Sequence, residues 1–416
     1  MTWACWLAVV GLWLGFAWTL PPTSAVALND FVGYYKAGDS FALGEVERLY
    51  EPGRKWFTNL PVVSALFAPL GSLPYPTAWL LFWWIQLVAW GATYALLLYG
   101  LQRHFPPFTA PRVLAATVVF LAFAPVMRRC LVQGQTTPIM LLLMTGSWLL
   151  LHARRSKAAG VLMGVVCIIK IPPMLLVGGA LARRRLALSL TALALVVFAV
   201  VVSWLAFPSE LLGQYAERVI TSNAGRGHAA FNNRSLEAFW LRLLTDRSLL
   251  DWYPLPSPPW VAFVSFASSF GLLTLVAWRG RRLWWPSRAP DDSDGRTGSL
   301  ELELALGSAL MLLVFPIVWI HYALFLALPL TVLPFWWMAR QLPARPLVVV
   351  VLLLGWWLVS GTEVPSNVAV GSRLYDPVFR LAQSAQTLGA VLLVLGLLAP
   401  LGAIASRTRE DVSGSR

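Results

Sequence analysis

The stretch "HARRSKAAGVLMGVVCIIKIPPMLLVGGALARRR" (residues 152–185) is the most informative about architecture. Its two apolar segments, 158–170 and 172–182, meet at "IKIPP", which contains a lysine and two prolines. Each segment is too short to cross a bilayer as a straight helix, which takes about 20 residues. Both outer ends are basic, and basic residues collect on the cytoplasmic side of a membrane. We therefore expect a re-entrant hairpin or two short helices with Lys170 at the tip.

The rest of the chain also has the composition of a membrane protein. Its 416 residues are 58% hydrophobic and 12% charged, with a mean hydropathy of +0.67, whereas soluble domains are about 25% charged. Apolar runs recur along the chain, so we expect an all-α, polytopic integral membrane protein with about 10–12 transmembrane or re-entrant helices. Residues 60–73 form another short segment, re-entrant or interfacial. The expected spans lie near 3–20, 77–100, 111–127, 137–152, 186–207, 259–279, 302–319, 322–339, 346–360 and 385–405.

Charge assigns the two sides of this membrane. The net charge of +13 could indicate nucleic acid, but basic residues in short cytoplasmic loops produce the same total, so we expect no nucleic-acid partner. Residues 3–20 are expected to be a retained span; the alternative, a signal peptide, also leaves residue 28 outside. We expect a cytoplasmic linker at 280–300 and a cytoplasmic tail at 406–416. The polar segments expected outside are 21–60, 208–258 and 361–384.

Several enzyme classes are excluded by missing motifs. The sequence has no Walker A loop, Rossmann glycine pattern, His-x-x-x-His pair or serine nucleophile elbow. This argues against an ATPase, a Rossmann-type nucleotide-sugar enzyme, a zinc protease and a serine hydrolase. The three cysteines have no paired spacing, so neither a disulfide framework nor a zinc site is indicated.

Charged residues near the expected outer surface are candidates for chemistry. Asp30 could act as a general base for a hydroxyl, or it could simply cap a helix. Arg128 and Arg129 could bind phosphate, or their side chains could extend to lipid headgroups. Gln135 precedes a helix, where free backbone N–H groups favour anions. Lys170 between apolar segments indicates a functional site, the alternative being a lysine at the water interface.

Two later motifs add further candidates. In "NNRSLEAF" (232–239), Asn233 and Arg234 offer donors suited to sugar hydroxyls, although Asn or Ser could equally cap a helix here. In "FPIVWIHYALFLALP" (315–329), His321 could bind a hydroxyl or a phosphate, or could be an ordinary interfacial residue.

Taken in chain order, the motifs resemble a known family. They are "NDFVGYYKAG…GEVERLYEP", "LPVVSALFAPLGSLP", "QGQTTPIMLLL", "AAGVLMGVVCIIKIPPMLL…ARRR", "NNRSLEAF" and "PIVWIHYALFLALP". This order is similar to that of the integral-membrane GT-C glycosyltransferases of glycosyltransferase family 87, the bacterial polyprenyl-phosphate-mannose-dependent mannosyltransferases. The resemblance extends over residues 10–340.

The resemblance implies a fold, a location and a reaction. It implies a single GT-C transmembrane domain over residues 1–405 in the plasma (inner) membrane, with the active site on the extracytoplasmic face. It also implies transfer of a hexose, usually mannose, from a polyprenyl-phosphate-hexose donor to a hydroxyl of a glycolipid or glycan acceptor, with inversion. No metal or other cofactor is implied.

The resemblance also implies roles for individual residues. Asp30 matches the catalytic acidic residue of the first external loop and would deprotonate the acceptor hydroxyl. The residues expected to hold the donor phosphate are Arg128, Arg129, Lys170 and His321. The residues expected to bind the sugar or the acceptor are Tyr34, Tyr35, Gln135, Asn233 and Arg234.

Other functions stay open at this stage. A transporter or lipid flippase would share a re-entrant segment and a buried lysine. It should also show a symmetry-related pair of interrupted segments, whereas the sequence shows only one clear case. A membrane glycan polymerase or ligase of another family and a non-catalytic assembly protein are the remaining alternatives.

Overall fold

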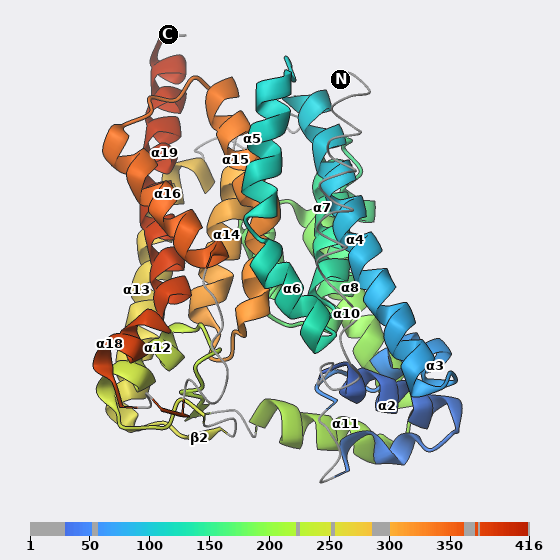
Figure 1. Ribbon diagram of the computed structural model, residues 1–416. Coiled ribbons are helices and arrows are strands. Elements are labelled where there is room, and N and C mark those ends of the chain that lie inside the picture. The colour runs from blue at the N-terminus through green and yellow to red at the C-terminus, as the bar shows by residue number, and fades with distance from the viewer. Residues whose placement is uncertain are drawn as a thin grey trace. The chain divides into compact units, whose positions relative to one another are not determined.

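The computed structural model describes residues 30–51, 57–221, 225–250, 254–284, 300–361, 371–372 and 375–414. The span expected at 3–20 and most of the linker expected at 280–300 lie outside these residues. The described chain is almost entirely helical, with one short antiparallel strand pair (Figure 1). The expectation of an all-α fold is therefore confirmed.

The chain divides into two compact units, which we describe separately. Unit 1 contains the described residues of 1–177 and 186–224, and unit 2 contains Gly178–Arg185 and the described residues from 225 onward. The single domain expected over residues 1–405 and the cytoplasmic tail at 406–416 stay predictions.

Unit 1 is built from helices of very different lengths. Its short helices are α2 (Phe31–Ala42), the 3-10 helix η1 (Val46–Tyr50), α3 (Val63–Gly71), α11 (Ser209–Tyr215) and the π-helix η2 (Ala216–Ile220). Its longer helices are α4 (Tyr75–His104), α5 (Ala110–Leu121), α6 (Ala124–Gln133), α7 (Thr137–His152), α8 (Ser156–Ile169) and α10 (Leu186–Leu205). Helix α9 (Met174–Ala182) contains the boundary between the two units.

Unit 2 contains the remaining elements. The short ones are β1 (Arg226–Gly227), α12 (Leu236–Leu244), β2 (Leu255–Pro256), the 3-10 helix η5 (Ile320–Leu326) and α18 (Pro377–Ala382). The longer ones are α13 (Pro259–Trp284), α14 (Leu300–Val314), α15 (Ala327–Ala339), α16 (Pro346–Ser360) and α19 (Ala385–Gly414). Helix α19 packs against α13, α14 and α16.

Four described helices are long and apolar enough to cross a membrane: Tyr75–His104, Leu186–Leu205, Pro259–Arg281 and Ile320–Ala339. Helices α5 and α6 add a fifth if they form one span bent by 42°. Shorter apolar helices occupy Thr137–His152, Ser156–Ile169, Pro346–Ser360 and Ala385–Leu401. This content of apolar helices, together with the helical fold, agrees with an integral membrane protein.

The break expected at Lys170 is present. Helix α8 ends at Ile169, Lys170 has an extended backbone, and α9 begins at Met174. Pro172 and Pro173 explain the interruption, because proline lacks an N–H donor and restricts the residue before it. Whether 158–182 re-enters the membrane or spans it stays a prediction.

Helix α8 packs closely on α10 because small residues lie at the crossing. A Cβ added at Gly160 would lie 2.5 Å from the carbonyl oxygen of Leu188, and one at Gly164 would lie 3.0 Å from Cβ of Leu195. Glycines spaced four residues apart allow helix backbones to approach in the same way in many membrane proteins.

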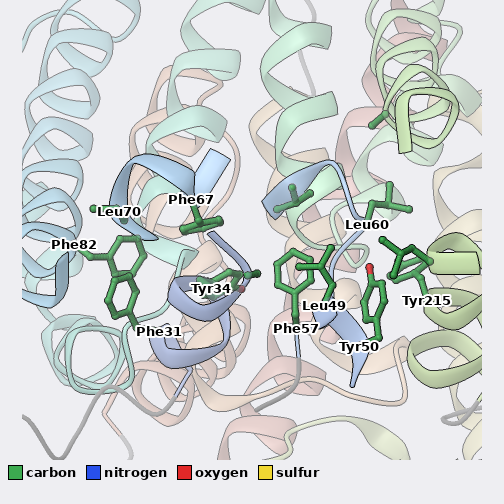
Figure 2. Close-up of a cluster of buried hydrophobic side chains, with 14 of the residues drawn as sticks. Phe31, Tyr34, Leu49, Tyr50, Phe57, Leu60, Phe67, Leu70, Phe82 and Tyr215 are labelled. Atoms are coloured by element: carbon green, nitrogen blue, oxygen red, sulfur yellow. The ribbon is translucent and has the colours of Figure 1, made fainter. Parts of the chain in front are cut away.

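An aromatic cluster holds α2 in place in unit 1. Figure 2 shows Phe31 and Tyr34 on α2 pointing to neighbouring aromatic rings. Phe31 stacks on Phe82 at 4.6 Å between ring centroids, and Tyr34 stacks on Phe67 at 4.6 Å. Because this cluster fixes the helix, it also fixes the position of Asp30 at the helix start.

Candidate active site

Asp30 occupies the N-cap position of α2, but its side chain does not cap the helix. Instead, one carboxylate oxygen accepts a hydrogen bond from Nε2 of Gln135. The backbone N–H of Asp30 donates to the carbonyl of Gln133 at 3.1 Å, which ties the start of α2 to the end of α6. The carboxylate is therefore directed toward the segment between α6 and α7 and away from its own helix.

Gln135 connects this carboxylate to Lys170. Its Oε1 accepts a hydrogen bond from Lys170 Nζ at 2.9 Å, while its Nε2 donates to Asp30. Lys170 is 9% exposed and lies at the C-terminal end of α8. One amide side chain thus joins an acid and a cation that are 140 residues apart in sequence.

Gln86 supports this arrangement from α4. With its amide oriented so that both ends are satisfied, it donates to the carbonyls of Gln135 at 2.9 Å and Cys130 at 3.0 Å. We did not identify Gln86 from the sequence. The signal was available, since a glutamine inside an apolar span usually has a polar partner.

The electrostatic neighbours of Asp30 are mainly cationic. Lys170 and Arg129 both interact with its charge. Arg129 is half-buried, and its Nε makes no hydrogen bond among the described residues, whereas Arg128 is exposed. Burial, with a smaller contribution from Asp30, raises the pKa of Tyr34 to about 12, so this hydroxyl stays protonated at neutral pH.

The segment around the two arginines differs from expectation. We expected one span over 111–127 followed by an external loop, but α5 ends at Leu121 and α6 runs from Ala124 to Gln133. Arg128 and Arg129 therefore lie on a helix rather than in a loop. Pro125 lies in the first turn of α6, where its missing N–H is tolerated, and Gly134 ends the helix in a left-handed conformation (φ 68°).

Both tyrosines of the candidate site are packed within unit 1. Tyr34 lies between Phe67 and the edge of Phe57 (Figure 2). Tyr35 donates its hydroxyl to the carbonyl of Leu73 at 2.8 Å and packs edge-on against Tyr75. Stacking of a sugar on either ring stays a prediction, and a sugar would have to share the ring faces with these neighbours.

In unit 2, two motifs that are far apart in the sequence lie side by side. The backbone N–H of Ile320 donates to the carbonyl of Asn232 at 2.9 Å, and Asn233 forms an antiparallel bridge with Trp319. This pairing places the Asn-Asn-Arg-Ser segment beside the start of η5, which carries His321. His321 is buried and stacks on Tyr322.

Asn233 is the centre of this pairing. Its Nδ2 donates to the carbonyls of His228 and Pro316, and its Oδ1 accepts from the backbone N–H groups of Ser235 and Val318. These four bonds use the full capacity of an amide side chain. A sugar hydroxyl would have to displace one of them, so the geometry gives Asn233 a scaffolding role.

The neighbouring residues differ sharply in their partners. Ser235 caps α12 by accepting from the N–H of Ala238 at 3.0 Å, which is the capping alternative that the sequence left open. Arg234 is 3% exposed, and its Nε and Nη1 make no hydrogen bond among the described residues. Burial lowers the pKa of Arg234 to about 9, so the guanidinium is still charged at neutral pH.

Among the described residues, no group of three or more His, Cys, Asp or Glu side chains could hold a metal ion. Unit 1 contains Asp30, Gln135, Lys170 and Arg129, and unit 2 contains His321 and Arg234.

Comparison with known proteins bears on this arrangement. The sequence profile of glycosyltransferase family 87 matches residues 57–316, which is more than half of the chain. The match covers Gln135, Lys170 and Arg234 and ends shortly before His321, while Asp30 precedes it. No curated protein has significant similarity to the chain.

Proposed function

The chain belongs to glycosyltransferase family 87 and is a membrane glycosyltransferase, and on that premise we propose which reaction it catalyses. It transfers a hexose, with mannose as the expected sugar, from a polyprenyl-phosphate carrier to a hydroxyl of a glycolipid or glycan. The transfer takes place on the extracytoplasmic face of the plasma membrane and inverts the anomeric configuration.

The observation that carries this proposal is the hydrogen-bonded chain Asp30–Gln135–Lys170. A transferase of this kind needs a base for the acceptor hydroxyl and a cation for the departing phosphate. The two hydrogen bonds hold Asp30 and Lys170 at opposite ends of one glutamine amide.

In the proposed reaction, Asp30 removes the proton from the acceptor hydroxyl as its oxygen attacks the anomeric carbon. The bond between that carbon and the phosphate oxygen breaks, and its electron pair leaves with polyprenyl phosphate. Lys170 and Arg129 stabilise the charge that develops on this phosphate. Arg128 and His321 are further proposed contacts of the phosphate, and Tyr34, Tyr35, Asn233 and Arg234 of the sugar or acceptor.

Attack from the side opposite the leaving group inverts the anomeric carbon. A β-linked donor therefore gives an α-linked product. Gln135 bonds to both Asp30 and Lys170. Its own proposed role is to fix the distance between the base and the lysine that binds the phosphate, with its amide close to the sugar.

A transfer assay tests the proposal. Purified protein is incubated with polyprenyl phosphate carrying tritium-labelled mannose and with a lipid extract of its host. We expect label to move to a new lipid or glycan with the wild type, and Asp30→Asn to reduce the rate by about 10²–10⁴-fold. Donor binding should be nearly unchanged, because the variant keeps the phosphate contacts.

Asp39→Asn is the matched control, since Asp39 lies on the same helix and is partly exposed. It should transfer label at the wild-type rate. Equal transfer by wild type and Asp30→Asn would contradict the role of Asp30 as base. Transfer by neither protein with mannose, but by the wild type with another polyprenyl-phosphate sugar, would correct the donor sugar alone.

A further inference from the structure

Among the described residues of unit 2, three arginines are buried, and two of them bind backbone carbonyls. Arg380 on α18 donates to carbonyls in and just after the last turn of α12, at 2.6, 2.7 and 3.2 Å. It therefore caps the C-terminal end of that helix, where a cation is favourable. Arg242 on α12 donates through Nη1 to the carbonyls of Ala230 and Asn233. These bonds give both side chains a structural role.

The third, Arg234, has no such role. Its Nε and Nη1 are buried without a hydrogen bond, and it forms no ion pair with a described carboxylate. A buried charge without a partner is strongly unfavourable, and leaving its donors unsatisfied adds to the cost. A group outside the described chain that bonded to Nε and Nη1 would remove this cost.

The surroundings of Arg234 favour an anion. Arg242 lies within electrostatic range of it, and the Nε of Arg242 donates to Ser384 immediately before α19. In the first turn of α19, Thr387 donates its hydroxyl to the carbonyl of Arg234 at 2.7 Å. The N-terminal end of a helix carries partial positive charge, so the Arg242 guanidinium beside it is repelled both by the helix end and by Arg234. A bound anion would offset both repulsions.

We propose that Arg234, Arg242 and the first turn of α19 form a binding site for a phosphate-type oxyanion. Guanidinium groups match phosphate oxygens with planar pairs of donors, and buried pairs of this kind are stronger than exposed ones. Arg242 can contribute its Nη2, which is also buried without a hydrogen bond. The phosphate belongs either to the headgroup of an anionic lipid or to free phosphate in solution.

This inference does not rest on the reaction proposed for Asp30. All of its residues lie in unit 2, and anion binding can be measured without glycosyl transfer. Failure of the transfer assay would leave it intact, and its own failure would affect only the ligand assigned to Arg234 and not the transfer by Asp30.

Thermal unfolding of the full-length protein in an uncharged detergent tests the site. One series contains inorganic phosphate at constant ionic strength. A second contains dioctanoyl phosphatidic acid, with dioctanoylglycerol as the phosphate-free control. We expect at least one phosphate compound to raise the unfolding temperature of the wild type. Arg234→Gln should need about tenfold more of it for the same shift, because a charge-assisted hydrogen bond is lost.

Arg226→Gln is the matched control, because Arg226 is exposed on β1 and the substitution removes the same charge. Its response should equal that of the wild type. An effect of inorganic phosphate identifies a free anion as a ligand, and an effect of the phosphatidic acid alone identifies a lipid headgroup. No stabilisation of the wild type by either compound, or an equal response in Arg234→Gln, overturns the proposal.

The unfolding temperature without added anion separates binding from a structural role. Arg234→Gln should then unfold at or above the wild-type temperature, because it removes a buried charge without a partner. A lower temperature with an unchanged response to phosphate would assign Arg234 to structure and overturn the site. If Arg234→Gln does not fold, Arg234→Lys decides, since it keeps the charge and loses the planar donors; a wild-type response there also overturns the site.

Discussion

At the scale of single residues, Gln135 is the side chain on which the proposed site depends most. Replacing it with leucine removes its bonds to Asp30 and Lys170 together. We expect Gln135→Leu to lower the transfer rate by about 10- to 100-fold, since hydrogen bonds to charged groups contribute about 1.5–3 kcal/mol. Initial rates at saturating donor measure this loss.

Gln102→Leu is the control for that experiment, because Gln102 is exposed near the end of α4. It should keep the wild-type rate. A decrease of less than twofold in Gln135→Leu would mean that Asp30 and Lys170 hold their positions without the amide. The two hydrogen bonds of Gln135 would then have no catalytic importance.

Asn233 gives a prediction about stability. Asn233→Ala removes four hydrogen bonds and leaves two buried backbone N–H groups and two carbonyls without this partner. We expect a loss of about 2–4 kcal/mol in the free energy of unfolding, measured by denaturation in detergent. Asn232→Ala is the control, because its Oδ1 has no hydrogen bond and its backbone bond to Ile320 is kept. Equal stability of the two variants would mean that the hydrogen bonds of Asn233 do not stabilise the fold.

The residues of the site were predictable to different degrees. Lys170 was recognisable because a lysine beside two prolines conflicts with an apolar helix. Its contact with Gln135 was not predictable, since no local pattern encodes a hydrogen bond across 35 residues. The backbone contacts of Asn233 were not predictable, because an amide side chain looks the same in sequence whether its partners are hydroxyls or backbone.

At the scale of helices, glycine at the crossing of α8 and α10 is the feature most open to test. We expect Gly160→Ala to lower the free energy of unfolding by about 1–3 kcal/mol, because its Cβ would lie 2.5 Å from a backbone carbonyl that cannot rotate away. Gly213→Ala on α11 is the control, since no atom lies within 4 Å of its added Cβ. Equal unfolding temperatures for these two variants would contradict close packing at the crossing.

Helix boundaries followed from the sequence where proline and glycine mark them. The ends of α7 and α16 lie within a residue or so of expectation because each begins with a proline in its first turn. The bend between α5 and α6 was missed, although Pro125 lay inside the expected span. Hydropathy continued across it, and hydropathy alone does not distinguish a straight span from a bent pair.

At the scale of the whole chain, the long apolar helices carry large exposed hydrophobic side chains. On α13 these are Trp260, Phe263, Phe266, Phe270 and Trp278. Soluble proteins rarely expose apolar surface of this extent, whereas side chains in contact with lipid are apolar. Composition predicted this feature, because 58% hydrophobic residues exceed what one core can bury.

The orientation in the membrane decides whether Asp30 can meet an external donor. The excess of basic residues in short loops predicts α2 outside and the α7–α8 junction inside. Single cysteines can report this, because the described native cysteines, Cys130 and Cys167, are buried. With Cys5 replaced by serine, a membrane-impermeant maleimide should label Glu47→Cys in intact cells and Lys157→Cys after permeabilisation. The reverse pattern would place Asp30 in the cytoplasm, where the proposed extracytoplasmic reaction could not use it.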